Sequence, residues 1–192
     1  MPTWDEILDE VQGEEAPDRF AIVRRKYARK LHEITNRNVI CYYSAFLTQS
    51  VYENLGIDDG DMSGFMTTIK GLDKALGLDL ILHTPGGSPT AAEAIITYLR
   101  SVFGTDIRII VPHLAMSAGT MMACAGKEIV MGKQSSLGPI DPQLGSIPAF
   151  NIKRLFDDAK DDIASNPQSA NYWSLLLGSI PPATIYDCIN AI

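Results

Sequence analysis

Between residues 78 and 131, short apolar runs alternate with longer amphipathic segments in a regular order. The runs at 78–82, 107–111 and 128–131 are rich in β-branched residues or leucine, which is typical of buried strands. The segments at 88–103 and 118–125 have the spacing and length of helices. Strands joined through helices by short links predict a parallel sheet that is covered by helices.

The rest of the chain extends this α/β pattern at both ends. Amphipathic spacing predicts helices over 4–12, 17–34 and 62–76. An apolar run predicts a further strand over 39–43, and the glycines and acidic residues over 48–61 indicate a surface connection. From residue 150 onward we expect helices that are divided at Asn166-Pro167 and at Pro181-Pro182. We therefore predict one domain, with N-terminal helices over 1–36, a catalytic core over 37–148 and C-terminal helices over 149–192. The apolar last helix suggests that the natural protein continues beyond it.

Composition excludes several classes of partner. A formal net charge of -7 disfavours binding to nucleic acid and to anionic membrane. The basic residues between 24 and 30 are interpreted as the solvated face of a helix. No run approaches the roughly 20 apolar residues that span a bilayer, and the acidic opening is unlike a secretory leader. Cys41, Cys124 and Cys188, an odd number without CxxC spacing, suggest buried free thiols. These features predict a cytoplasmic protein.

One candidate functional turn is Thr84-Pro85-Gly86-Gly87, at the carboxyl end of a predicted strand. Ligands of parallel sheets bind beyond such ends. Adjacent glycines permit positive φ angles and leave N–H groups uncovered, and such groups can hold a developing oxyanion. A plain strand-to-helix turn would explain the same residues.

A second turn, residues 115–120, carries Ser117 between small neighbours at the start of a buried helix. The helix N-terminus lowers the energy of negative charge near that hydroxyl. An ordinary N-cap serine is the alternative. Taken together, the two turns supply a nucleophile and an anion hole at the same edge of one sheet, which predicts an acyl-transfer site.

Three motifs in this order carry a resemblance to a known family: LHTPGG over 82–87, AMSAGT over 115–120 and SLGPIDPQ over 136–143. They resemble the serine dehydrogenase proteinase family (SDH-type serine proteases) of the clan that contains ClpP, signal peptide peptidase and crotonase. The resemblance implies a ClpP/crotonase-like superhelix of parallel strand–helix units, with helical additions at both ends. It also implies serine peptidase chemistry with Ser117 as the nucleophile. It further implies an oxyanion hole formed by Gly86, Gly87 and Ala118. The substrate-binding segment that it implies consists of Ser136, Leu137 and Gly138.

The general base is left open by the sequence. In ClpP a histidine follows the serine in the loop beyond the next strand, but here residues 132–143 contain no histidine and Asp141 stands at the closest place. In signal peptide peptidases the base is a lysine, which favours Lys153 first and Lys133 second; Lys133 would alternatively neutralise Asp141. His83 is a third candidate, either in a triad with Asp141 or as a residue that holds its own loop.

The leading hypothesis is a serine endopeptidase that acts on peptides or unfolded protein segments. A crotonase-like acyl-CoA enzyme would use the same glycine pair without a serine nucleophile, and a non-catalytic interaction module would keep only the fold. The resemblance further implies a homo-oligomer. No metal site and no ATP-binding loop are evident in the sequence, so no cofactor is expected.

Overall fold

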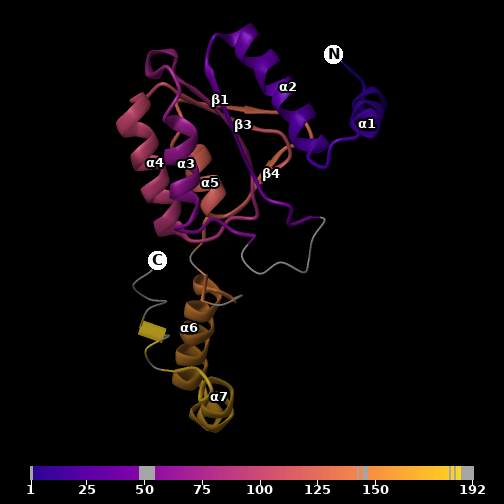
Figure 1. Ribbon diagram of the computed structural model, residues 1–192. Coiled ribbons are helices and arrows are strands. Elements are labelled where there is room, and N and C mark those ends of the chain that lie inside the picture. The colour runs from indigo at the N-terminus through magenta and orange to yellow at the C-terminus, as the bar shows by residue number, and fades with distance from the viewer. Residues whose placement is uncertain are drawn as a thin grey trace. The chain divides into compact units, whose positions relative to one another are not determined.

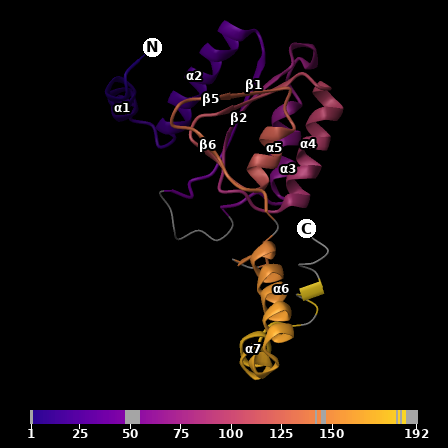
Figure 2. The same cartoon turned by 180° about the vertical axis from the view of Figure 1, so that it is seen from behind.

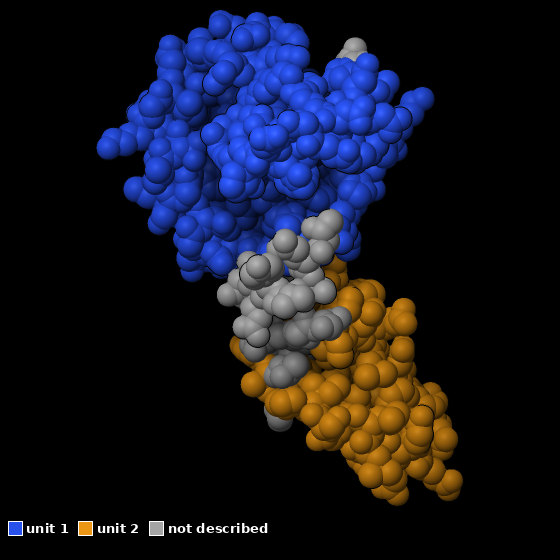
Figure 3. All heavy atoms as spheres, turned by 45° about the vertical axis from the view of Figure 1, so that its right-hand side comes forward, with its two compact units in different colours: residues 1–139 blue, residues 140–192 orange. Residues whose placement is uncertain are grey.

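The structure is a computed structural model, and it describes residues 2–47, 55–141, 143–144, 147–181, 183 and 185–186. Its residues form two compact units, 1–139 and 140–192 (Figure 3). Each unit has its own helices and strands. The single-domain division expected from the sequence stays a prediction.

A parallel sheet lies at the centre of the first unit. Its strands are β1 (Asn38–Tyr43), β2 (Leu78–His83), β3 (Ile107–Val111) and β5 (Glu128–Met131) (Figures 1 and 2). Their order in the sheet is β1-β2-β3-β5. All three pairings are parallel. The parallel sheet and the strands expected over 39–43, 78–82, 107–111 and 128–131 are therefore confirmed.

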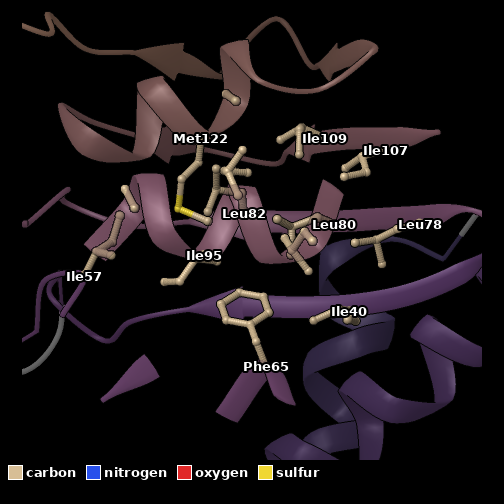
Figure 4. Close-up of a cluster of buried hydrophobic side chains, with 14 of the residues drawn as sticks. Ile40, Ile57, Phe65, Leu78, Leu80, Leu82, Ile95, Ile107, Ile109 and Met122 are labelled. Atoms are coloured by element: carbon tan, nitrogen blue, oxygen red, sulfur yellow. The ribbon is translucent and has the colours of Figure 1, made fainter. Parts of the chain in front are cut away.

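Helices cover both faces of this sheet. α1 (Trp4–Gly13) and α2 (Arg19–Thr35) lie on one side, and α3 (Asp61–Ile69), α4 (Pro89–Phe103) and α5 (Ala118–Cys124) lie on the other (Figures 1 and 2). Residues of β2 alternate between the two sides, as a pleated strand requires. The core lies on the α4 and α5 side, where Leu78, Leu80 and Leu82 are fully buried with Ile95 and Met122 (Figure 4).

A second, smaller pairing was not expected from the sequence. β4 (Leu114–Ala115) runs parallel to β6 (Ser136–Leu137), and Thr84 bridges Ala115 on the other side of β4. Three separate segments of the chain are thus held side by side beyond the carboxyl ends of the main strands. Two-residue strands are too short to produce an alternation that a sequence pattern can reveal.

Three expectations were wrong in part. The helix predicted over 62–76 ends at Ile69 and is followed by a 3₁₀ turn, η1 (Lys74–Leu76). Ile57, placed in a surface connection, is buried with 2% of its surface exposed, whereas residues 48–54 of that connection lie outside the described residues. Cys124 is exposed, not buried, and Cys41 is half-buried; Cys188 lies outside the described part of the chain.

An ion-pair network ties the amino-terminal ends of the strands. Asp79 on β2 is fully buried and accepts hydrogen bonds from Arg37 (2.6 Å) and Arg108 (2.5 Å). Arg37 also holds Asp106 at 3.0 Å. Such a bidentate arrangement satisfies a carboxylate that would otherwise be costly to bury.

The second unit contains the hairpin β7 (Gln143–Leu144) and β8 (Ile147–Pro148), then α6 (Ala149–Ser165), η2 (Pro167–Ser169) and α7 (Ala170–Leu177). The break expected at Asn166-Pro167 is confirmed. Most of the helix expected after Pro182 lies outside the described residues. In the described part of the chain, no helix has both the length and the apolar character that crossing a membrane requires.

Candidate active site

Ser117 occupies a strained turn between β4 and α5. Its backbone has φ 50° and ψ -119°, a combination that residues with a β-carbon rarely adopt. Its side chain makes no capping hydrogen bond to α5, so the reading as an ordinary N-cap serine does not describe it. The residue is half-buried. A serine on a sharp strand-to-helix turn, whose hydroxyl bonds to no described residue, has the geometry of a presented nucleophile.

The two turns singled out in the sequence lie against each other. Gly86 has φ +100°, and a β-carbon there would come 2.8 Å from the β-carbon of Ser117 and 2.7 Å from the carbonyl oxygen of Met116. At Gly119, two residues after Ser117, an added β-carbon would run into the methyl group of Thr84. Glycine is required at both places because the two turns approach so closely.

The amides of the glycine pair have different partners. The N–H of Gly86 donates to Thr84 Oγ1 at 3.1 Å, so it is already engaged. Gly87 pairs with Ile57 as in a parallel ladder, in which Ile57 N–H donates to Gly86 O (2.7 Å) and Ser88 N–H donates to Ile57 O (2.9 Å). In that pattern the N–H of Gly87 points away from Ile57.

Two amides near Ser117 are left without an acceptor. Neither the N–H of Gly87 nor that of Ala118 donates a hydrogen bond to any described residue. Ala118 follows Ser117 directly, and Gly87 follows the glycine that touches Ser117. Uncovered amides beside a hydroxyl are what an oxyanion hole requires.

The segment over 136–138 is fastened to the serine turn by Thr120. The buried Thr120 Oγ1 lies 2.7 Å from Ala115 O and 2.9 Å from Gly138 O, and it accepts the N–H of Gly138 at 3.0 Å. Gly138 N–H also lies 3.2 Å from Ala115 O. Ser136 is exposed and Leu137 packs at the edge of the core. This segment therefore runs alongside the strand that leads to Ser117.

His83 is turned toward the α1 and α2 side of the sheet, opposite to the neighbouring core residue Leu82. Its ring stacks on His113, with 5.6 Å between centroids, and its Nδ1 accepts the N–H of Leu114 at 3.4 Å. Burial, with a smaller effect of His113, lowers the pKa of His83. No hydrogen bond joins it to Ser117 in the described structure.

The other candidate bases have separate surroundings. Lys133 is exposed on the loop after β5 and has no partner among the described residues. Lys153 lies on α6 of the second unit and pairs with Asp157 at 2.7 Å. Asp141 is half-buried at the start of that unit. Among all the candidates for the base and its partner, His83 and Lys133 belong to the same compact unit as Ser117, whereas Lys153 and Asp141 belong to the second unit.

Sequence reasoning missed the structural roles of three residues that shape the site: Ile57, Thr84 and Thr120. Ile57 was the one apolar residue between Gly56 and two aspartates, which is a weak signal for burial. Thr84 and Thr120 both stand inside the quoted motifs, and a threonine in a motif of small residues could have indicated a buried hydroxyl that bonds to backbone.

A half-buried serine on a strained turn, facing a glycine pair at the edge of a helix-covered parallel sheet, agrees with the ClpP-like class that the three sequence motifs resemble. The family model described as ClpP-like SDH-type serine proteinase matches residues 15–169. The chain belongs to this family, and the α/β, ClpP-like fold class expected from the sequence is confirmed.

Two proteins of Methanocaldococcus jannaschii are similar to the chain, and both are described as uncharacterized. MJ0137 is 39% identical over 179 residues, which cover 91% of this chain and 59% of that protein. MJ1495 is 37% identical over 107 residues, which cover 56% of this chain and 36% of that protein. The chain thus spans less than two thirds of the length of either relative.

Proposed function

We propose that the chain is a serine endopeptidase that cleaves peptides or unfolded protein segments through an acyl-enzyme on Ser117. The observation that supports it is the strained Ser117 next to Gly86, beside the amides of Gly87 and Ala118, which have no acceptor among the described residues. The family name, a serine proteinase, agrees with this chemistry.

In the proposed reaction, Ser117 Oγ attacks the peptide carbonyl carbon while a base takes the hydroxyl proton. The amides of Gly87 and Ala118 donate to the oxyanion. Gly86, whose N–H is held by Thr84, sets the turn instead of donating. The C–N bond then breaks, the proton passes to the leaving amine, and water hydrolyses the ester to restore Ser117.

The substrate would lie along Ser136, Leu137 and Gly138. Thr120 ties Gly138 to the turn of Ser117, so a peptide aligned with this segment would be held in a fixed relation to the nucleophile. Leu137, packed at the core edge, would provide the apolar contact.

For the base we propose Lys153, with Lys133 as the alternative. His83 is a weaker candidate because its Nδ1 is engaged by Leu114 and its ring packs on His113, on the side of the sheet away from α5. A lysine acts as a base only when burial or a nearby positive charge lowers its pKa. The ion pair of Lys153 with Asp157 would have to open in the working enzyme. Asp141 would have a catalytic role only in the His83 alternative, as the carboxylate partner of that histidine.

The working form is proposed to be a homo-oligomer in the cytoplasm. Its mass, measured by light scattering after size exclusion, tests the assembly. A strict monomer that hydrolyses peptides at full rate would contradict it.

Labelling with a fluorophosphonate, followed by peptide mapping, tests the nucleophile. We expect modification at Ser117, its loss in Ser117→Ala, and full labelling in Ser101→Ala, which removes an exposed hydroxyl on α4. Hydrolysis of an acyl-CoA thioester without labelling would instead support the crotonase-like reading. A folded chain that shows neither reaction would support a non-catalytic module.

A further inference from the structure

A cavity of about 610 Å³ lies between α1, α2 and the face of the sheet that is turned away from α4 and α5. Its volume is in the range of small-molecule sites. Apolar and aromatic side chains from both helices and from β1 and β2 form its walls, including Trp4, Leu8, Phe20 and Ile81. Trp4 and Phe20 at its mouth are 76% and 60% exposed, which is unusual for large apolar side chains that serve only a core.

Arg24 is the one residue of this lining with a permanent charge. Its guanidinium stacks over the ring of Tyr43, 4.0 Å from the ring centre, and it has no carboxylate partner among the described residues. The next two cations on α2 are paired, Arg25 with Asp18 and Lys26 with Glu10. In a chain of net charge -7, a half-buried cation that faces an apolar cavity without an acid is an attractive point for an anion.

A second donor stands at the same corner. Tyr43, on which Arg24 stacks, is the register partner of His83 on the neighbouring strand, and both line the cavity. Because Leu114 N–H donates to Nδ1 of His83, the proton of the neutral ring is on Nε2. That Nε2–H has no acceptor among the described residues.

We propose that this cavity binds an apolar carboxylate of the fatty-acid type, with its tail among the side chains of α1 and α2 and its carboxylate on Arg24 and His83. The apolar walls account for the tail, and the guanidinium and the imidazole N–H account for one anionic group that needs two donors. The site lies on the opposite side of the sheet from α5, so it does not depend on the proposed peptidase reaction.

Decanoate and decanol, used below their aggregation concentrations, are the probes. In a Trp173→Phe background, Trp4 at the cavity mouth is the one remaining tryptophan, so its fluorescence reports binding. We expect decanoate to bind about tenfold or more tighter than decanol, as charge-assisted hydrogen bonds predict. Arg24→Gln should remove that difference, whereas Arg24→Lys should keep most of it.

Two further variants complete the test. Arg25→Gln, which removes a neighbouring exposed cation, should leave decanoate binding unchanged. Ala28→Phe, which adds a ring to the lining, should weaken both probes. Equal affinity for decanoate and decanol, an unchanged affinity in Arg24→Gln, no binding of either probe, or full binding in Ala28→Phe would each overturn the proposal. Repeating the titration in Ser117→Ala separates the result from any failure of the peptidase hypothesis.

Discussion

Gly86 and Ser117 touch across two turns that are thirty-one positions apart in the chain, with 2.8 Å between an added β-carbon at 86 and the β-carbon of Ser117. Gly86→Ala should therefore destabilise the fold by about 1–3 kcal/mol through backbone strain, and should also slow labelling of Ser117. Gly64→Ala is a matched control, because a β-carbon in that helical position meets nothing within 4 Å. It should leave stability equal or up to about 1 kcal/mol higher. Chemical denaturation measures both, and a neutral Gly86→Ala would show that the turns do not meet.

Lys153→Ala should lower the rate of Ser117 labelling and of peptide hydrolysis by about 10²- to 10⁴-fold, the usual contribution of a general base. Lys160→Ala, an exposed lysine on the same helix, should keep the full rate. The rate should be followed from pH 6 to 10 in the wild type and in Lys133→Ala and His83→Ala as well. Full activity in all three variants of Lys153, Lys133 and His83 would remove every base proposed for this site.

Thr120→Val keeps the shape of the side chain but removes the hydroxyl that joins Ala115 to Gly138. It leaves buried backbone groups with one partner fewer, so we expect a loss of about 1–3 kcal/mol in stability. We also expect peptide hydrolysis to show a raised KM, while fluorophosphonate labelling changes less, because the small probe does not need the 136–138 segment. Thr120→Ser should restore KM. Equal loss of both reactions in Thr120→Val would indicate a purely structural role.

Asp79→Ala should be the most destabilising of the proposed changes, at about 3–5 kcal/mol, because it leaves Arg37 and Arg108 without their buried carboxylate. Asp18→Ala removes the exposed partner of Arg25 and should alter stability by about 1 kcal/mol or less. Urea unfolding of the two variants compares them directly. Similar midpoints would mean that the buried network contributes no more than a surface pair.

His83 makes the stability of the first unit depend on pH. Because burial lowers its pKa when folded, the unfolded chain binds the proton more tightly. Its contribution is complete above the unfolded value of 6.5 and is lost as the pH falls from there through the folded value. His83→Asn, whose side-chain oxygen can still accept the N–H of Leu114, should flatten this slope between pH 7.5 and 5.5. An equally steep slope in the variant would assign the effect to another group.

The elements that the sequence predicted well are those with long, regular apolar patterns. β2, β3 and α4 are examples, since each buries a continuous stripe or run, whereas β5 was recognised from its apolar residues although most of it is exposed. The helix over 62–76 failed because Leu72 and Leu76 kept the helical spacing, although Gly71 and Asp73 favour a turn there.

At the site, the identities of the two turns were readable, but their hydrogen bonds were not. From the sequence, Gly86 and Gly87 were equally good candidates for the oxyanion hole. In the structure the N–H of Gly86 donates to Thr84, so of the two glycines only Gly87, which pairs with Ile57, has an amide without a described acceptor. Such a difference depends on which carbonyl faces which amide, and residue types do not encode it. The general base cannot be identified from the sequence either. A lysine on a polar helix gives the same sequence pattern whether it is only solvated or takes part in catalysis.

The left-handed backbone of Ser117 also bears on any attempt to make this protein more robust. Glycine adopts that conformation without steric penalty, so a search for heat-resistant variants that scored unfolding temperature alone would tend to replace the serine first. If Ser117 is the proposed nucleophile, its β-carbon and hydroxyl lower the stability of the turn but are needed for the reaction, so the most thermostable variant is expected to be inactive.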